Sequence, residues 1–167
     1  MTAELRVYTE RVSSNRTEAL FLVLTLLCLL LSIWRVSIAG LDVLAIVLVC
    51  LSGFFLFYAL NYRVLLIRLT PELVELKFGL FTWTIATANI EACGLDDISL
   101  WRIGGAGIHF SPIRGRYRAM FNFLEHPRVV IALKTKRGLV RDVALSTRRP
   151  EEVLRFIQAA AFTGRDA

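Results

Sequence analysis

The chain has 167 residues, a hydrophobic fraction of 56%, a mean hydropathy of +0.58 and a formal net charge of +6. This length holds about one ordinary domain and a small addition, while the hydropathy is too high for an ordinary soluble domain, so membrane-spanning segments are expected. The three cysteines, Cys28, Cys50 and Cys93, show no zinc-type spacing and imply no disulfide framework.

Two uncharged runs near the N-terminus, 19–34 and 43–62, are predicted to be membrane-spanning helices. At about 1.5 Å per residue the second run covers the thickness of a hydrocarbon core. Neither run contains an ionisable residue, whereas pumps and proton relays place such residues at membrane depth. The two helices are therefore expected to anchor the chain or to pack against other helices.

The short connector, 35–42, requires the two helices to run antiparallel as a hairpin. The connector has one basic residue, Arg35. The basic residues that flank the outer ends of the hairpin are Arg6, Arg11, Arg16, Arg63, Arg68 and Lys77. By the positive-inside rule both termini are expected on the cytoplasmic side of a cell (inner) membrane. A cleaved secretory signal is the alternative, because "SIA" before Gly40 resembles a cleavage site, but residues 1–18 carry no net positive charge.

From residue 63 onward, short runs with alternating apolar residues predict strands rather than helices. Turn residues separate the runs, and Lys136-Arg137-Gly138 is a strong hairpin signal. The expected strands are 63–69, 72–78, 80–87, 89–98, 116–123, 128–135 and 139–145. A final helix is expected to begin at Pro150 and to pack on the sheet through apolar residues at helical spacing: Val153, Leu154, Phe156, Ile157 and Ala160 or Ala161.

The stretch 101–109, "WRIGGAGIH", contains Gly104, Gly105 and Gly107. A phosphate-binding loop needs a strand before it and a helix directly after it, whereas a strand-like run and a Pro-containing turn follow here. The glycines are therefore expected to allow a bulge, a positive φ or a close approach between strands, with Trp101 packed beside them.

Residues of the types used in catalysis are sparse. His109 and His126 lie far apart, without a carboxylate-histidine or cysteine pattern. Asp96 and Asp97 would point to opposite faces of a strand, and in a turn they would stabilise the backbone. The sequence therefore predicts no catalytic, cofactor-binding or metal-ligating residue, and it has no nucleic-acid recognition motif.

Basic residues are the more suggestive feature, with ten Lys or Arg against two Asp or Glu between positions 114 and 149. Arg114, Arg116 and Arg118 alternate and would share one face of a strand, and three further cations crowd a predicted hairpin tip. The candidate contacts with an anionic lipid or a protein partner are Arg114, Arg116, Arg118, Lys134, Lys136 and Arg137. Each cation near anionic headgroups adds about 1 kcal/mol of attraction, and an ordinary solvated surface is the alternative.

The order of these elements resembles bacterial and archaeal membrane proteins in which two N-terminal spans precede a pleckstrin-homology-like (PH-like) domain. The resemblance covers about residues 20–162 and depends on "LTPELVELKFG" (69–79), "GGAGIH" (104–109) and "STRRPEE" (146–152), with Gly115 and Tyr117 after the glycines. Two positions depart from it: His109 stands where arginine is more usual, and Arg148 where an acidic residue is common.

The resemblance implies an α+β membrane protein with a cytoplasmic segment 1–18, a transmembrane helical hairpin 19–62, a cytoplasmic PH-like domain 63–162 and a tail 163–167. That domain would be an antiparallel β-sandwich or barrel of about seven strands capped by a C-terminal helix.

PH-like folds host lipid binders, docking modules and structural domains alike. The resemblance implies a non-enzymatic, membrane-anchored interaction or regulatory module. Together with the basic residues, it leads us to expect contacts with membrane lipids and with an integral-membrane or cytoplasmic protein partner. No cofactor, nucleic acid or small-molecule substrate is expected. The alternatives are an accessory or assembly subunit of a larger integral-membrane complex, or an enzyme, for which we find no nucleophile, metal site or cofactor motif.

Overall fold

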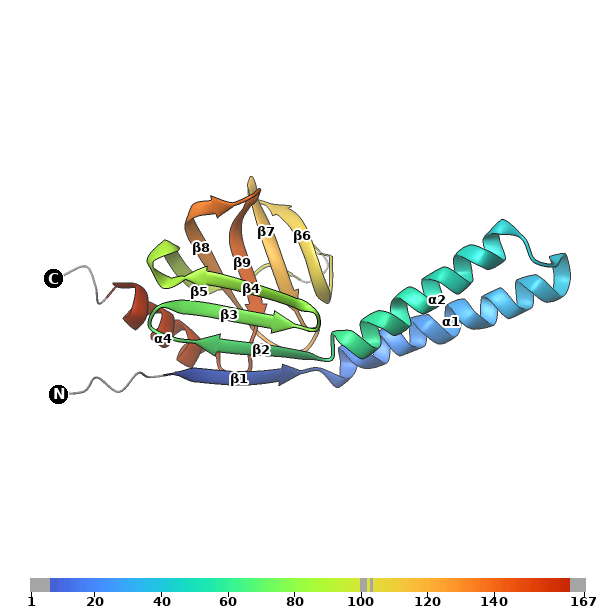
Figure 1. Ribbon diagram of the computed structural model, residues 1–167, viewed down its shortest axis with the longest axis horizontal. Coiled ribbons are helices and arrows are strands. Elements are labelled where there is room, and N and C mark those ends of the chain that lie inside the picture. The colour runs from blue at the N-terminus through green and yellow to red at the C-terminus, as the bar shows by residue number, and fades with distance from the viewer. Residues whose placement is uncertain (1–6, 100–101, 103, 163–167) are drawn as a thin grey trace.

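The structure is a computed structural model that describes residues 7–99, 102 and 104–162. Two long helices project from one end of a β-sandwich, whose opposite end is covered by a C-terminal helix (Figure 1). The predicted order of two apolar helices, β-sheets and a final helix is confirmed.

The helical hairpin consists of α1 (Asn15–Ala39) and α2 (Val43–Asn61), both long and apolar enough to cross a membrane. Ser14 caps α1 by accepting a hydrogen bond from the Thr17 amide, and Asp42 caps α2 in the same way. Helix α1 extends past the predicted run, so the connector is shorter than expected, and Arg35 pairs with Asp42 at 2.7 Å.

Two serines join the helices to each other. The Ser32 hydroxyl donates to the Ala45 carbonyl at 3.2 Å, and the Ser52 hydroxyl donates to the Thr25 carbonyl at 3.1 Å. Small polar residues of both helices are thus used inside the hairpin, while most of its large apolar side chains are exposed.

The first sheet has the strand order β1-β2-β3-β4, with antiparallel neighbours throughout. Strand β1 was not predicted, whereas the other three were. Their bounds are β1 (Tyr8–Ser13), β2 (Val64–Leu69), β3 (Leu73–Phe78) and β4 (Phe81–Ala86). The N-terminal segment is therefore an edge strand of the sandwich.

The second sheet has the order β5-β8-β9-β7-β6 and follows a 3₁₀ turn, η1 (Thr87–Asn89). Its members are β5 (Ile90–Leu95), β6 (Gly107–Ile113), β7 (Arg116–Asn122), β8 (Arg128–Arg137) and β9 (Val140–Ser146). The β8–β9 hairpin forms as predicted, but β9 inserts between β7 and β8 and pairs with β7 in parallel. The prediction of a wholly antiparallel sandwich is therefore wrong at this pair.

The main core lies between the sheets and is closed by α4 (Pro150–Phe162). Val153 and Ile157 are fully buried, and because they lie one turn apart on α4 they face the sheets together, as predicted. A second, smaller core of Ile113, Met120 and Ala144 lies on the other face of the second sheet, where Ile98 packs against it.

The hairpin and the sandwich share a core at their junction. The ring of Tyr62, directly after α2, is buried among the core residues and contacts Tyr58 and Phe78 at centroid distances of 4.6 and 5.3 Å. The Leu124 amide donates to Thr17 Oγ1 at 3.2 Å. These contacts hold the helices and the sandwich together as one packed body.

The glycine stretch has the backbone expected of it. Gly104, Gly105 and Gly107 have φ values of +92°, +87° and +102°, which favour glycine. A Cβ at Gly107 would lie 3.5 Å from the Tyr58 ring, so this end of β6 approaches the hairpin closely. Trp101, expected to pack beside the glycines, lies outside the described residues.

Candidate functional site

Three arginines and three carboxylates form a continuous series of ion pairs on the second sheet. Its members alternate in sign, in the order Glu91, Arg116, Asp142, Arg118, Asp96 and Arg128. The distances between successive charged groups are 3.3, 3.0, 3.5, 3.1 and 3.2 Å. We call this series the ion-pair chain. Because the signs alternate, each buried charge has a neighbour of opposite charge, which offsets the free-energy cost of removing it from water.

Strand alternation places the centre of the ion-pair chain. Ala119 and Phe121 of β7 face the main core, as do Val143 and Leu145 of β9, so Arg118 and its register partner Asp142 point to the other face. The Arg118 side chain is only 9% exposed because its guanidinium is enclosed between Asp142 and Asp96.

The ion-pair chain also holds the segment after β5 against the sheet. Asp96 pairs with both Arg118 and Arg128, and the Arg128 guanidinium donates to the Ile98 carbonyl. Burial lowers the pKa of Arg128, and Asp96 opposes this change by stabilising the charged form. These contacts keep Ile98 over the small core of the second sheet.

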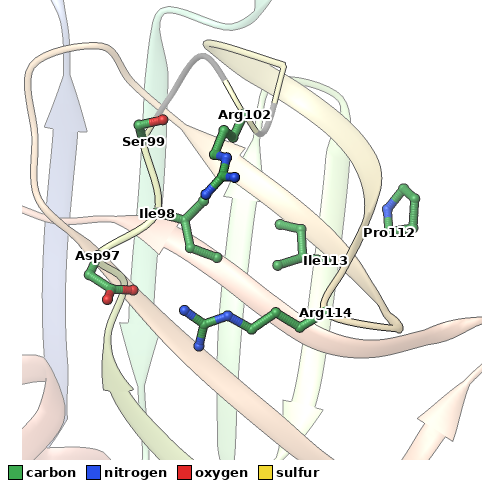
Figure 2. Close-up of a pocket in the computed structure, with 7 residues that line it drawn as sticks. All are labelled: Asp97, Ile98, Ser99, Arg102, Pro112, Ile113 and Arg114. Carbon is green, nitrogen blue, oxygen red and sulfur yellow. The ribbon is translucent and has the colours of Figure 1, made fainter.

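Beside this segment lies a hollow of about 530 Å³, which we call the arginine hollow. Its lining residues come from the segment after β5, the end of β6 and the following turn: Asp97, Ile98, Ser99, Arg102, Pro112, Ile113 and Arg114. Figure 2 shows Arg102 and Arg114 entering from opposite sides, with Ile98 and Ile113 between them.

Two guanidinium groups against the single carboxylate of Asp97 give the arginine hollow a net positive charge. Within the part of the chain that the structure describes, neither Arg102 nor Arg114 has an ion-pair partner. Guanidinium groups bind carboxylates and phosphates through paired hydrogen bonds, and the two isoleucines offer an apolar floor. The described lining includes no histidine or cysteine that could activate Ser99, and the described residues contain no group of metal-ligating side chains.

The predicted arginine triplet is divided between two environments. Arg114 has φ +50° and forms the β6–β7 turn with Gly115, so it does not share a strand face with Arg116 and Arg118. Arg116 and Arg118 do share a face of β7, but both belong to the ion-pair chain. Contact between Arg118 and a lipid or partner stays a prediction, although burial leaves little of this side chain to make one.

The three predicted cations of the β8–β9 hairpin lie at the same end of the second sheet as the turn that holds Arg114. The register shows this, because Tyr117 at the start of β7 and Arg137 at the end of β8 both pair with Val140. Lys134 Nζ donates to the Ala88 carbonyl at 2.6 Å, and Arg137 lies 4.7 Å from the Trp83 ring centroid. Lys136 is exposed. Arg137 thus fastens the hairpin to β4 of the first sheet, and Lys134 fastens it to η1.

His126 and Arg148 have structural contacts with the N-terminal strand. His126 Nε2 lies 2.9 Å from the Ser13 carbonyl oxygen, and Arg148 donates to Ser13 while its amide donates to Glu10. Arg148, a departure from the resembled family, therefore helps to hold β1 in the sheet. All three cysteines are free, and burial raises the pKa of the Cys93 thiol.

Several residues of the site were not singled out by sequence reasoning. Arg102 lies within the glycine stretch and Ser99 just before it, without a motif around them, and Asp142 and Arg128 have apolar neighbours in their strands. One signal was available for Asp142. It precedes the apolar Val143 in "LVRDVAL", and because successive strand residues point to opposite faces, Asp142 should face away from the core.

Comparisons of this chain with models of protein families, with curated proteins and with solved structures find no match. The class of the protein is therefore known from its own structure alone: it is an α+β chain with two long apolar helices.

Proposed function

We propose that the protein is a non-enzymatic interaction module anchored in a membrane by its helical hairpin. The sandwich stands at the cytoplasmic face and presents the arginine hollow to an anionic group of a protein partner. The observation that carries this proposal is the shared core at the junction, where Tyr62 follows α2 and is buried among sandwich residues. A module joined in this way is held in one orientation to the membrane.

The hairpin surface supports the membrane part of the proposal. Large apolar side chains are exposed along both helices, including Leu30 and Ile46, and an apolar surface of this extent needs lipid or other helices around it. Arg35, near the connector end of α1, is paired with Asp42, whereas Arg11 and Lys77 at the base of the hairpin have no acidic partner among the described residues. This distribution favours a cytoplasmic sandwich.

We also propose that the sandwich is a PH-like domain. Its two sheets and the C-terminal helix that closes the core support this kinship. Strand β1 and the parallel β7–β9 pair are additions to the arrangement that the resemblance implied.

The proposal is tested by photo-cross-linking in cells at the rim of the arginine hollow. A photoreactive residue replaces Pro112, which is exposed on edge strand β6, and a matched probe replaces exposed Thr9 on the outer face of the first sheet. We expect a protein adduct at position 112 but not at position 9. Because hydrogen bonds to charged groups are worth about 1.5–3 kcal/mol each, Arg102→Ala combined with Arg114→Ala is expected to reduce the adduct at least tenfold.

An adduct that is unchanged in the double variant contradicts the role of the arginine hollow. Recovery of the protein outside the membrane fraction contradicts the anchor. Copurification with a large complex at constant stoichiometry supports the alternative function, an accessory or assembly subunit.

A further inference from the structure

A second basic region lies at the base of the hairpin, on the outer side of the first sheet. Two adjoining hollows of about 650 and 330 Å³ occur there and share Arg11, Asn61 and Val64. We call them together the junction hollow. Figure 1 shows the place, where β1 continues into α1 and α2 continues into β2.

Three exposed cations line the junction hollow: Arg11, Arg63 and Lys77. Its acidic lining residue, Glu18, pairs with Arg63 at 3.0 Å. Arg11 and Lys77 have no acidic partner within the described ranges 7–99, 102 and 104–162. The junction hollow therefore has an excess of positive charge that the described part of the protein does not neutralise.

Strand register places Arg11 and Lys77 on one face of the sheet. Arg11 pairs with Leu66, and Leu66 pairs with Lys77, so the two cations are two strands apart and flank an apolar side chain. Neighbouring strands are about 4.8 Å apart, which separates the two Cα atoms by roughly 10 Å. A phosphodiester between them is within reach of both long side chains.

The depth of the junction hollow matches the headgroup layer of a membrane. Helix α2 has 19 residues and spans roughly 28 Å, close to the thickness of the hydrocarbon core, so its end at Asn61 lies where headgroups begin. Exposed apolar residues border the same level: Leu60 on α2, and Leu80 and Phe81 on the β3–β4 turn. Gly79 in that turn contacts Asn61 and Tyr62, which fixes the turn against the helix end.

The cations predicted from the sequence lie elsewhere. Gly107 approaches the hairpin at Tyr58, whereas Arg114 follows the opposite end of β6, about 20 Å away along the strand. The junction hollow is therefore the basic region closest to the proposed membrane surface.

We infer that the junction hollow binds the phosphate of an anionic phospholipid, with Arg11 and Lys77 on the phosphate and with Leu60 and Leu80 beside the acyl chains. This inference rests on the membrane anchoring proposed above. Charge complementarity and the position at the headgroup layer both favour a membrane phospholipid over a soluble phosphate.

The test uses the full chain in phosphatidylcholine nanodiscs, with and without phosphatidylglycerol, and native mass spectrometry to count retained lipids after release. We expect phosphatidylglycerol to be retained in preference to phosphatidylcholine. Two cations at about 1 kcal/mol each correspond to a preference of about thirtyfold, which Arg11→Gln combined with Lys77→Gln should remove. Arg11→Lys keeps the charge and should keep most of the preference.

The matched control removes the same charge away from the hairpin, through Arg68→Gln combined with Arg141→Gln, both exposed cations. Equal loss of preference in the two double variants overturns the inference, because it would show a net-charge effect only. Binding of inorganic phosphate that competes equally with the lipid would also overturn it. Failure of the wild-type chain to enter nanodiscs contradicts the anchoring itself, whereas entry without a lipid preference contradicts the junction hollow alone.

Discussion

Arg118 is the central residue of the ion-pair chain because its guanidinium connects Asp142 on β9 to Asp96 after β5. Removing one partner of a buried ion pair is costly, since the remaining charges stay out of water. We expect Arg118→Met to lower the free energy of unfolding by about 3 kcal/mol. Arg116→Met removes a cation that is 35% exposed and should cost less than about 1 kcal/mol. Urea unfolding of the full chain in detergent micelles, followed by tryptophan fluorescence, measures both, and equal losses would contradict the central position of Arg118.

The pairing of these charged residues could not be predicted from the sequence. Asp96, Arg118, Arg128 and Asp142 come from four separate segments, and only the three-dimensional order of the strands brings them together. The alternation of Arg116 and Arg118 was visible, but an exposed basic face and a buried ion-paired face have the same spacing. The carboxylates opposite them decide between the two, and those lie more than twenty positions away along the chain.

At the scale of elements, the β3–β4 hairpin is held against the end of α2 by a glycine. A Cβ at Gly79 would lie 2.5 Å from the Asn61 carbonyl oxygen, whereas one at Gly138 would meet open space, although the two φ values are +60° and +62°. We expect Gly138→Ala to cost about 1 kcal/mol from its left-handed backbone alone. Gly79→Ala should cost about 1–3 kcal/mol more, because the turn must move off the helix end. Thermal unfolding in micelles compares the two, and equal costs would show that the contact contributes nothing.

Local pattern was enough to predict most elements, but the expected strands did not include β1 or β6, and the order of the second sheet was not predicted. Residues 8–13 alternate in burial, but the charged residue Glu10 stands at an inward position. This hides the strand pattern, so the segment looks like a polar tail in the sequence. Glu10 accepts hydrogen bonds from the Tyr8 hydroxyl nearby and from Thr147 and the Arg148 amide at the other end of the chain. The two distant partners are not visible in the local sequence. The insertion of β9 between β7 and β8 also depends on pairing between strands that are distant in the sequence, so the local pattern does not reveal it.

At the scale of the whole molecule, the hairpin and the sandwich act as one body, whereas the sequence suggested an anchor followed by a separate domain. Two apolar runs and a change of periodicity predicted the two parts. The junction depends on Tyr62 entering the sandwich core and on Leu124 bonding Thr17, contacts that no composition boundary reveals. If the hairpin spans a membrane as proposed, this packed junction would hold the arginine hollow and the junction hollow at defined distances from the membrane surface.

That fixed arrangement makes the membrane orientation testable with two single cysteines, in a chain whose Cys28, Cys50 and Cys93 are replaced by alanine. Leu41 in the connector and Leu139 on the β8–β9 turn are matched probes, since they are 76% and 72% exposed. Positive charge collects at the base of the hairpin, so the sandwich is expected inside and the connector outside. A membrane-impermeant maleimide should label Leu41→Cys but not Leu139→Cys in intact cells, and both after permeabilisation. Labelling of Leu139→Cys alone in intact cells would reverse the orientation and place both basic hollows outside the cytoplasm, where the proposed cytoplasmic partner has no access to them.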